Sequence, residues 1–461
     1  MAKYQKYAEY KDSGIEWLGE IPSHWTATAL KRYSRITDGS HHSPKIEIEG
    51  FPFVSVTDVG INNINFFDAK KITETDYLRL VKEGCKPAVN DVLLTKDGTI
   101  GRACIVTEDM PDFVILSSLG LITPNKEISS HFLYYYLVSG INVDQMNSVI
   151  HGSALKRMTI NKINDLILTF PDFYEQEKIA SFLDHETAKI DTLIAKQEKL
   201  IELLKEKRQA VISHAVTKGL NPDVKLKDSG VEWLGQVPEH WGVSRLKNII
   251  RSLESGCSVN AADIPAQSNE LGVLKTSCVY TRSFRIEENK TVVPEDIHRV
   301  KCKVRKGAII ISRMNTPELV GASALVKVEA DNIYLPDRLW QTIFFENIDI
   351  DAEYLSHFMT VQGFRDQIAL GAEGASSSMQ NIAKEDYLNI NCLVPPLEEQ
   401  IQIRAFIEQK LAVLSNLNMK AQEAVERLKE RRTALISSAV TGKIDVRNWQ
   451  HPNEAKTEFS A

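Results

Sequence analysis

Two long stretches of the chain place hydrophobic residues at the three- and four-residue spacing of an α-helix. They cover residues 174–217 and 398–441, contain neither proline nor glycine, and are rich in Glu, Lys, Leu and Ala. From Ile179, and again from Ile403, the pattern alternates steps of four and three residues, which is typical of a coiled-coil seam. In the first stretch this seam includes Leu193 and Leu200. We therefore expect two long helices.

The two helical stretches align with each other without a gap, Tyr174 falling on Glu398. Two amphipathic helices lying on separate cores are the commoner outcome of such patterns. The matched length favours helices that pair with each other instead, as do the polar breaks that both seams share at the same three places: Glu186/Lys410, Lys207/Arg431 and His214/Ser438.

The connection after the first helix predicts the direction of the pairing. Each helix would be about 65 Å long at the usual rise per residue. The link from Thr217 to Lys227 is short and contains Pro222, so it cannot run back along the helix. We expect antiparallel helices, with the two remaining domains at opposite ends of a rod.

A second repeat lies ahead of each domain. "KDSGIEWLGEIPSHW" at residues 11–25 returns as "KDSGVEWLGQVPEHW" at residues 227–241. The segments that follow, residues 26–170 and 242–394, share an outline of strand-like runs but little sequence, and each has a Gly- and Ser-rich stretch near residues 150–160 or 370–382. We expect the repeated phrase to mark the start of each half, with its tryptophans as packing anchors: Trp17, Trp25, Trp233 and Trp241.

These patterns predict an α+β protein. It has two mixed α/β domains separated by two long antiparallel helices, and the whole is a pseudo-twofold internal repeat. The expected segments are a first domain at 1–170, a first helix at 171–217, a linker and second domain at 218–394, a second helix at 395–442 and a C-terminal tail at 443–461.

Composition adds limits on function. The 461 residues are 43% hydrophobic and 25% charged, as in a globular protein with a sizeable core. No run approaches the roughly 20 apolar residues that span a bilayer. The start of the chain is polar, and the six cysteines form no Cys-x-x-Cys pair, which predicts a cytoplasmic protein without zinc. The net charge of −6 disfavours a free-standing nucleic-acid binder, but it allows local basic patches or a partner that contacts phosphates.

A search for catalytic motifs finds none. The chain has no phosphate-binding Gly-x4-Gly-Lys loop, no dinucleotide fingerprint, no nucleophile elbow and no Asn/Asp-Pro-Pro-aromatic motif of amino-methyltransferases. The pair His41-His42 has no neighbouring cysteine or acidic cluster, so a binding loop is favoured over a metal site. We expect a non-catalytic binding protein that holds no metal or cofactor of its own.

Two similar modules suit a DNA duplex that is read at two places, about one helical turn or a multiple of it apart. Arginine can bind guanine and asparagine adenine, while lysine mostly contacts phosphates. Singly, each such residue is more often an ordinary solvated charge. Their grouping in loops at equivalent places predicts DNA contacts for Lys31, Arg32, His41, His42, Lys45, Lys96, Arg102, Lys156, Arg157, Arg282, Arg285, Arg305, Lys306, Arg313, Asn315 and Arg338.

The order of these motifs resembles the specificity subunit of Type I restriction-modification systems. The likeness covers nearly the whole chain and includes "PDFYEQEKIASFL" and "PPLEEQIQIRAFI" at the helix starts, with "ITDGSHHSPKIEIEGFPFVSVTDV" and "LPDRLWQTIFF" in the two domains. The resemblance implies two target-recognition domains that read a split DNA site across an unspecified spacer, and a role in DNA methylation and phage defence.

The same resemblance implies partners and their cofactors. Two modification subunits would bind the helices and methylate adenine with S-adenosylmethionine, and restriction subunits that use ATP and Mg²⁺ would join outside them. Because the two domains differ strongly in sequence, the two half-sites should differ too.

Two other interpretations remain open at the level of sequence. One is a protein-interaction scaffold on a coiled coil that binds no nucleic acid, which the acidic net charge supports. The other is the recognition half of a restriction-methyltransferase fusion. An adjacent reading frame with an Asn-Pro-Pro-aromatic motif would favour the multisubunit interpretation over both.

Overall fold

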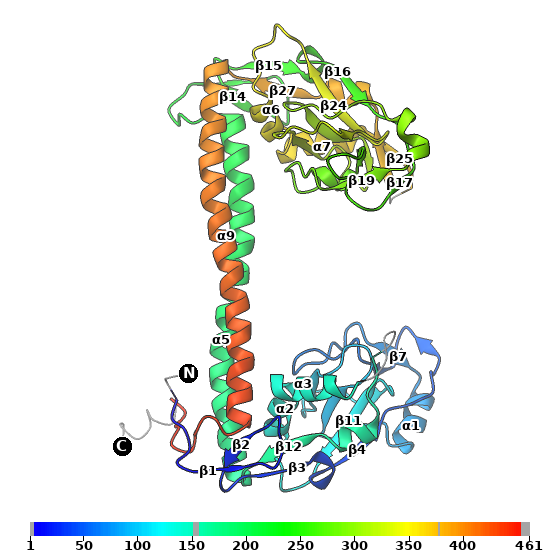
Figure 1. The fold of residues 1–461 in the computed structure, drawn as a ribbon, viewed down its shortest axis with the longest axis vertical. Helices are drawn as coiled ribbons and strands as arrows, with labels where there is room; N and C mark the ends of the chain where they lie inside the picture. The colour runs from blue at the N-terminus through cyan, green and yellow to red at the C-terminus, as the bar shows by residue number, and fades with distance from the viewer. Residues whose placement is uncertain (1–3, 151–155, 377–378, 453–461) are drawn as a thin grey trace. The chain divides into compact units, whose positions relative to one another are not determined.

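The computed structural model describes residues 4–150, 156–376 and 379–452 of the chain. The chain divides into two compact units, residues 1–198 with 422–461 and residues 199–421 (Figure 1). Each unit contains one mixed α/β domain and part of both long helices. Each expected Gly- and Ser-rich stretch is described only in part, because residues 151–155 and 377–378 lie outside the described residues.

Unit 1 is built on a four-stranded antiparallel sheet of order β4-β11-β8-β9, beside a second four-stranded sheet of order β10-β6-β7-β5. Its elements are β1 (Tyr10–Asp12), β2 (Glu20–Pro22), β3 (Thr26–Ala29), η1 (Leu30–Arg32), β4 (Ser34–Asp38), β5 (Ile46–Glu47), β6 (Phe51–Val54), β7 (Lys70–Ile72), α1 (Glu74–Lys82), β8 (Val92–Thr95), β9 (Ala103–Ile105), β10 (Val114–Ile115), β11 (Leu119–Pro124), α2 (Ser130–Val138), α3 (Gly140–Ser148), α4 (Ile160–Asn164), β12 (Ile167–Phe170) and the start of α5 (Phe173–Lys218).

Unit 2 repeats this plan with a central sheet of order β16-β24-β20-β22 and a neighbouring sheet of order β17-β19-β18-β23. Its elements are β13 (Leu226–Asp228), β14 (Gln236–Pro238), β15 (Gly242–Arg245), η2 (Leu246–Asn248), β16 (Ile250–Ser255), β17 (Ala261–Ala262), β18 (Gly272–Leu274), η3 (Thr276–Val279), β19 (Asn289–Val292), η4 (Pro294–Arg299), β20 (Ile309–Ser312), β21 (Met314–Asn315), β22 (Ser323–Leu325), β23 (Ile333–Tyr334), β24 (Leu339–Phe344), α6 (Ala352–Phe358), α7 (Gln362–Gly371), β25 (Ala372–Ser376), β26 (Met379–Ile382), α8 (Lys384–Asn389), β27 (Asn391–Val394) and the start of α9 (Leu397–Val440).

The two units share most of their elements, while the three-stranded sheet of order β21-β26-β25 belongs to unit 2. In each, the repeated phrase forms a two-stranded hairpin (β1-β2, β13-β14), and the next strand pairs with the strand before the long helix (β3-β12, β15-β27). The neighbouring sheet of each unit has one parallel pair, β10-β6 or β18-β23, and its other pairs are antiparallel. The expected mixed α/β fold with an internal repeat is confirmed.

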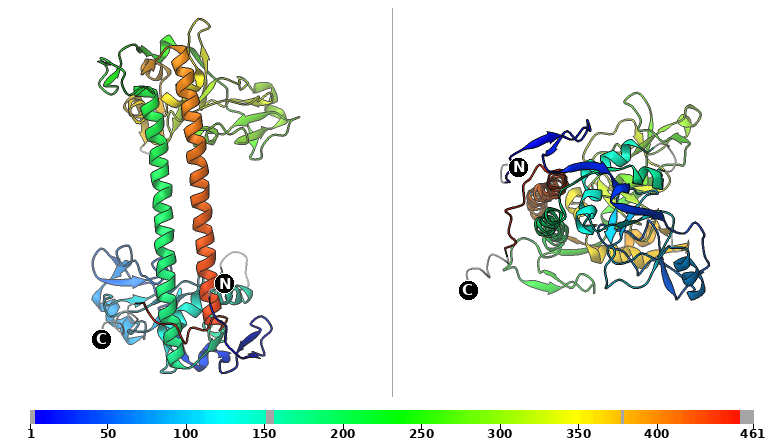
Figure 2. Two further views of the ribbon diagram at one scale, coloured as in Figure 1. Left: turned by 90° about the vertical axis from the view of Figure 1, so that its left-hand side faces the viewer. Right: turned by 90° about the horizontal axis from the view of Figure 1, so that it is seen from below.

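The long helices run antiparallel within each unit (Figures 1 and 2). In unit 1 the buried Trp25 lies near the end of α9, because a Cβ added to Gly442 would come within 3.3 Å of the Trp25 ring. The Trp25 indole also donates a hydrogen bond to Glu175 at the start of α5. In unit 2 the buried Trp241 lies beside Gly219 at the end of α5 and bonds Glu399 at the start of α9. The start of one helix therefore lies beside the end of the other, as the short connection predicts.

The seam between the helices differs in part from the expected one. The expected positions Leu193 and Leu200 are 46% and 41% exposed, whereas Ile194 and Ile201 are half-buried. Beyond Ile190, the expected positions Gln197, Leu204 and Val211 remain half-buried. The expected positions between them are exposed, and the next residues, Ile194, Ile201 and Arg208, are half-buried instead. A strict seven-residue pattern drifts about 20° per heptad around an ideal helix, so the expected seam turns away from the partner. Within the described residues, Leu193 and Leu200 therefore remain exposed on the outer face.

A repeated cluster of three side chains explains why the tryptophan phrase occurs twice. In unit 1, Glu175 lies 2.8 Å from Nε2 of His24 and accepts a hydrogen bond from Nε1 of Trp25 at 3.3 Å. In unit 2, His240 and Trp241 hold Glu399 in the same way, at 2.7 and 3.0 Å. We call each His–Trp–Glu set a clamp. Each clamp ties the hairpin of its unit to the start of a long helix.

The expected anchoring role is confirmed for some tryptophans only. Trp25 and Trp241 have no exposed surface, and Trp233 is half-buried against Phe358. Trp17 is 45% exposed, so the prediction was wrong for this residue. It lies in the tight turn between β1 and β2, where the side chain projects from the hairpin instead of entering the core.

The glutamine that follows each clamp glutamate forms a second repeated lock. In unit 1, Gln176 accepts from the Ser129 amide at 2.9 Å and donates to the carbonyls of Glu127 and Pro171, each at 3.0 Å. In unit 2, Gln400 makes the same three bonds at 2.8, 3.0 and 2.8 Å, with Asp351, Asp349 and Pro395. Both glutamines are buried, and losing them would leave the backbone groups that they bond without these partners.

We predict that Gln176→Leu lowers the free energy of unfolding of unit 1 by about 3 kcal/mol, because three backbone groups lose their partner, two of them in the buried residues Ser129 and Pro171. Hydrogen exchange should speed up at the start of α2 and α5, and Gln400→Leu should act in the same way on unit 2 alone. Gln402→Leu, at an exposed position of α9, is the control and should change neither unit. Equal loss of protection in both units after Gln176→Leu would contradict this account.

Candidate nucleic-acid interface

The strongest candidate loop leaves the same strand in both units. In unit 1, Lys96 follows β8, and its amide donates to the carbonyl of Ser118 at 3.0 Å. In unit 2, Arg313 follows the matching strand β20, and its amide donates to the carbonyl of Arg338 at 3.0 Å. The sheet order thus places one basic residue of each unit at an equivalent point, as the sequence predicts.

Lys96 lies inside a cluster of charges in unit 1. Its Nζ is 3.1 Å from Asp38 and 4.0 Å from Asp97, and Asp97 also lies 3.3 Å from Nε of Arg157. Nε2 of His41 is 3.2 Å from the other oxygen of Asp38. The structure therefore brings together three of the candidate residues. The lysine is only 1% exposed, so it orders the loops around it and does not itself reach a ligand at the surface.

The equivalent point in unit 2 has different chemistry. Strand pairing places Ser255 where unit 1 has Asp38, and Met314 where it has Asp97, so both carboxylates are replaced. The guanidinium of Arg313 instead lies 6.0 Å from the ring centre of Trp340, and its Nε donates to Asn381 at 3.4 Å. An arginine over an aromatic ring is held in place while its outer edge stays available.

Asn315 takes part in internal bonds. Its Nδ2 donates to the hydroxyl groups of Tyr280 at 2.8 Å and Ser312 at 3.2 Å, and its Oδ1 accepts from the Thr316 amide. The side chain is nearly buried. In this arrangement the amide positions the loop that carries Arg313.

Four other candidates lie at the surface in ion pairs, and a fifth, Arg285, is half-buried and also donates to the Ser277 carbonyl at 3.1 Å. Lys31 on η1 pairs with Asp165 at 2.7 Å, and the remaining pairs are Lys45–Glu47 at 2.8 Å, Arg305–Glu254 at 3.0 Å, Lys306–Glu329 at 3.3 Å and Arg285–Glu288 at 3.3 Å. Exposed pairs of this kind contribute at most about 1 kcal/mol each. They can open toward a phosphate at little cost, but they do not mark a preformed site.

The best-exposed candidates have no such partner. Among the described residues, no ion pair or side-chain hydrogen bond engages the side chains of Arg32, His42, Lys156 and Arg338. Arg102 donates to the carbonyl of Val59 at 3.2 Å and is otherwise exposed. Arg282 is half-buried, with one terminal nitrogen that is fully covered and unbonded.

Sequence reasoning missed the residues that position the candidates. Asp38 and Asp97 were not singled out, although each is followed directly by glycine at a turn, a common position for a polar group that organises a loop. Trp340 and Asn381 gave no local signal, because only the pairing of β24 and β26 with their neighbours brings them to Arg313.

The described residues contain no group of three or more His, Cys, Asp or Glu side chains arranged to hold a metal ion. None of the described helices is long and apolar enough to cross a membrane.

Comparison with known proteins defines the class. Residues 45–203 match the family model for a Type I restriction modification DNA specificity domain. The chain is also similar over nearly its whole length to curated Type I restriction enzyme specificity subunits. Specificity subunits are non-catalytic components of Type I restriction-modification systems.

The relatives are distant but cover nearly all of the chain. The Type I restriction enzyme EcoKI specificity subunit of Escherichia coli K12 is 23% identical, over 94% of this chain and 92% of its own length. The MjaVIII specificity subunit of Methanocaldococcus jannaschii is 24% identical, over 95% and 98%. A chain from a structural study of the assembly and conformational transition of the type I R-M system has a TM-score of 0.68 at 14% identity, covering 92% of this chain and 99% of that one.

We predict that Lys96→Met lowers the stability of unit 1 by about 2–3 kcal/mol, because Asp38 loses the buried half of its ion pair. Thermal or denaturant unfolding measures this change. Lys45→Met, which removes an exposed pair, is the control and should change the unfolding free energy by less than about 1 kcal/mol. Adding Asp38→Asn to Lys96→Met should recover part of the loss. A double variant that is less stable than the single one would contradict a direct pair.

Proposed function

We propose that this chain reads a DNA target made of two different half-sites, one for each unit, and that it docks the catalytic subunits of a Type I restriction-modification complex. The observation that carries the proposal is the contrast at the equivalent loops. The two units share their clamps, sheet order and helix contacts, yet Lys96 lies in an acidic cluster while Arg313 lies over Trp340. A shared scaffold with different contents suits two readers of different sequence.

The exposed, unpaired candidates supply the chemistry for DNA contact. An arginine such as Arg338 can donate two hydrogen bonds to guanine in the major groove, and Lys156 suits a phosphate. The loops that carry them are held by backbone bonds to the loops that follow the central strands β8 and β20, namely from the Gly98 amide to the Lys156 carbonyl and from the Arg313 amide to the Arg338 carbonyl, each at 3.0 Å. A firmly held loop loses little conformational freedom on binding.

The outer faces of the long helices suit the partner subunits. Hydrophobic side chains there are exposed to between 41% and 55%: Leu193, Leu200, Leu203, Val413, Leu417 and Met419. Exposed apolar positions on a helix are typical of surfaces that another protein covers. We propose that two modification subunits, which carry S-adenosylmethionine and methylate adenine, bind these faces, and that restriction subunits using ATP and Mg²⁺ join outside them.

The acidic net charge fits this division of labour. A chain with net charge −6 has little general attraction for DNA. Basic surfaces on the partner subunits would then supply most phosphate contacts, while this chain supplies selectivity. A scaffold that binds no nucleic acid would explain the charge equally well, but it would not explain the match to a DNA specificity domain.

The test is to map methylated adenines in cells that carry this chain with its modification subunits. We expect one split motif with two unlike halves, and we expect it to disappear when this chain alone is deleted. Methylation that persists without the chain, or a motif that is continuous or has identical halves, would overturn the proposal.

We predict that Arg338→Ala weakens binding of the assembled complex to its own target by about 1–3 kcal/mol and relaxes selection at one half-site. The midpoint of thermal unfolding should stay unchanged, because the side chain has no described partner. Lys306→Ala, which removes a paired surface charge of the same unit, is the matched control and should cost less and leave selectivity intact. Equal effects of the two variants would show that Arg338 does not read a base.

A further inference from the structure

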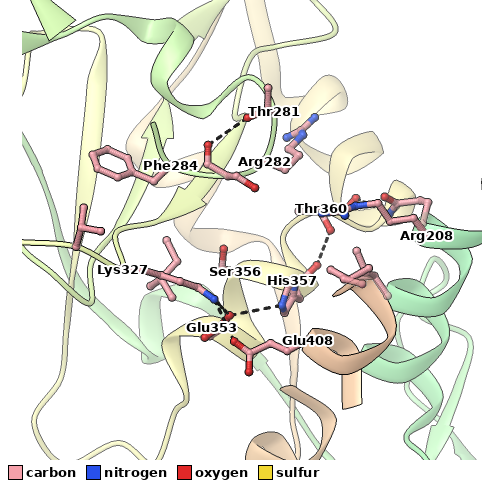
Figure 3. Close-up of a pocket in the computed structure, with 16 residues that line it drawn as sticks. Arg208, Thr281, Arg282, Phe284, Lys327, Glu353, Ser356, His357, Thr360 and Glu408 are labelled. Atoms are coloured by element: carbon pink, nitrogen blue, oxygen red, sulfur yellow. Dashed lines mark hydrogen bonds and ion pairs between the residues drawn. The ribbon is translucent and has the colours of Figure 1, made fainter. Parts of the chain in front are cut away.

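Unit 2 contains a cavity of about 390 Å³ between its domain and the two long helices (Figure 3). Arg208 and Ile212 of α5, Glu408 of α9 and the α6 residues Ser356 and His357 contribute to its walls. Arg282 and Phe284 close the domain side. The volume lies in the range of ordinary small-molecule sites, and none of the DNA contacts proposed above lies in it apart from Arg282.

The matching place in unit 1 is filled. The caps of α2 and α6 correspond, because Ser129 and Asp351 hold the equivalent glutamines, so Ser356 and His357 stand where unit 1 has Tyr134 and Tyr135. Both tyrosines are buried, and the hydroxyl of Tyr135 donates to Asp184 of α5 at 2.5 Å. A serine and a histidine occupy less space than two tyrosines. The repeat thus provides an internal comparison of a filled site with a hollow one.

The two units also differ in the charged residues of the long helices beside this place. In unit 1, Arg432 of α9 makes a two-bond ion pair with Asp191 of α5, at 2.8 and 3.2 Å. The helix alignment places Arg208 at the position of Arg432 and Ser415 at the position of Asp191. Within the described residues, Arg208 accordingly has no ion pair and no side-chain hydrogen bond. Arg282 also lines the cavity, and among the described residues no ion pair or side-chain hydrogen bond engages it.

The charges on the other wall of the cavity are paired with one another, and Nη1 of Arg404 also lies 3.9 Å from Glu353. Lys327 binds both Glu353 and Glu408, the latter at 3.1 Å. Burial, with the nearby positive charges of Lys327 and Arg208, lowers the pKa of His357 to about 4, so this side chain is neutral at ordinary pH. The surplus charge of the cavity therefore comes from Arg208 and Arg282, while Ile212, Phe284 and Leu325 supply an apolar wall.

We propose that this cavity binds a small organic anion, a phosphate monoester with an aromatic or apolar body. Arg208 and Arg282 hold the phosphate, for which guanidinium groups have several donors in a planar arrangement. The apolar body occupies the space that Tyr134 and Tyr135 fill in unit 1. The proposal does not depend on the DNA-reading function, because it concerns an unfilled space and unpaired cations that unit 1 lacks.

The test uses the purified full chain and phenyl phosphate as the probe, with phenol as its uncharged analogue, in titration calorimetry. We expect phenyl phosphate to bind at one site and phenol at least about tenfold more weakly. Ser415→Asp supplies the missing carboxylate at an exposed position and should weaken phenyl phosphate by about tenfold without loss of stability. The double variant Ser356→Tyr/His357→Tyr should abolish binding by filling the space.

Arg432→Met, at the matching position of unit 1, is the control for Arg208→Met and should leave binding unchanged, whereas Arg208→Met should abolish it. The proposal is wrong if the folded wild-type chain does not bind phenyl phosphate, if phenol binds equally well, or if Ser415→Asp has no effect on the affinity. Displacement of phenyl phosphate by duplex DNA would assign the site to a backbone phosphate and overturn the small-ligand assignment. A second result would also overturn the small-ligand assignment. If the chain does not bind phenyl phosphate and Ser415→Asp weakens association with the partner subunits, the site binds a side chain of a partner protein.

Discussion

The contact between a glutamate and the indole and imidazole of a His-Trp pair organises each half of this protein. Glu175 and Glu399 stand at the first turn of a long helix, where a negative charge is favourable to the helix dipole. Each carboxylate is held by the tryptophan that packs on the end of the other helix. One interaction therefore connects the hairpin, the start of one helix and the end of the other. Because the chain has two such junctions, the residues that form the junction occur twice in its sequence.

The junction leaves the interior of each domain free to diverge. The clamp, the buried glutamine and the strand before the helix fix where the central sheet lies, but they do not contact the loops at the other edge of that sheet. The loops after β8 and β20 can therefore carry an acidic cluster in one unit and an arginine over a tryptophan in the other. The same freedom explains why the space beside α6 is hollow while the space beside α2 is filled.

Most of the architecture could be predicted because it rests on repeated local patterns. The helices at residues 174–217 and 398–441 agree with α5 and α9 to within a few residues, and their antiparallel pairing follows from the short link. The expected seam was wrong at Leu193 and Leu200, since a strict heptad does not follow a straight helix for six turns. The prediction that Trp17 packs into the core was also wrong, because the local sequence does not show which face of a hairpin is covered.

The site could be predicted less well, because it depends on contacts between distant segments. The repeat correctly placed Lys96 and Arg313 at equivalent points, but their partners come from other strands: Asp38 from β4, Trp340 from β24 and Asn381 from β26. Burial also decides what a charge can do. Lys96 and Asn315 lie inside the loops, whereas Arg32 and Arg338 remain exposed, and no local sequence pattern separates the two groups. The sequence therefore indicates which loops are candidates for DNA binding, but not which of their residues can contact DNA.

The central claim is that a repeated scaffold carries two independent readers. The most direct measurement exchanges residues 26–170, which lie between the first clamp and its helix, for the corresponding segment of another specificity subunit, and then maps the methylated motif in cells. The account predicts that one half of the motif changes to that of the donor while the other half stays the same. A motif in which both halves change, or a complex that no longer methylates although both clamps are intact and the chain is folded, would contradict it.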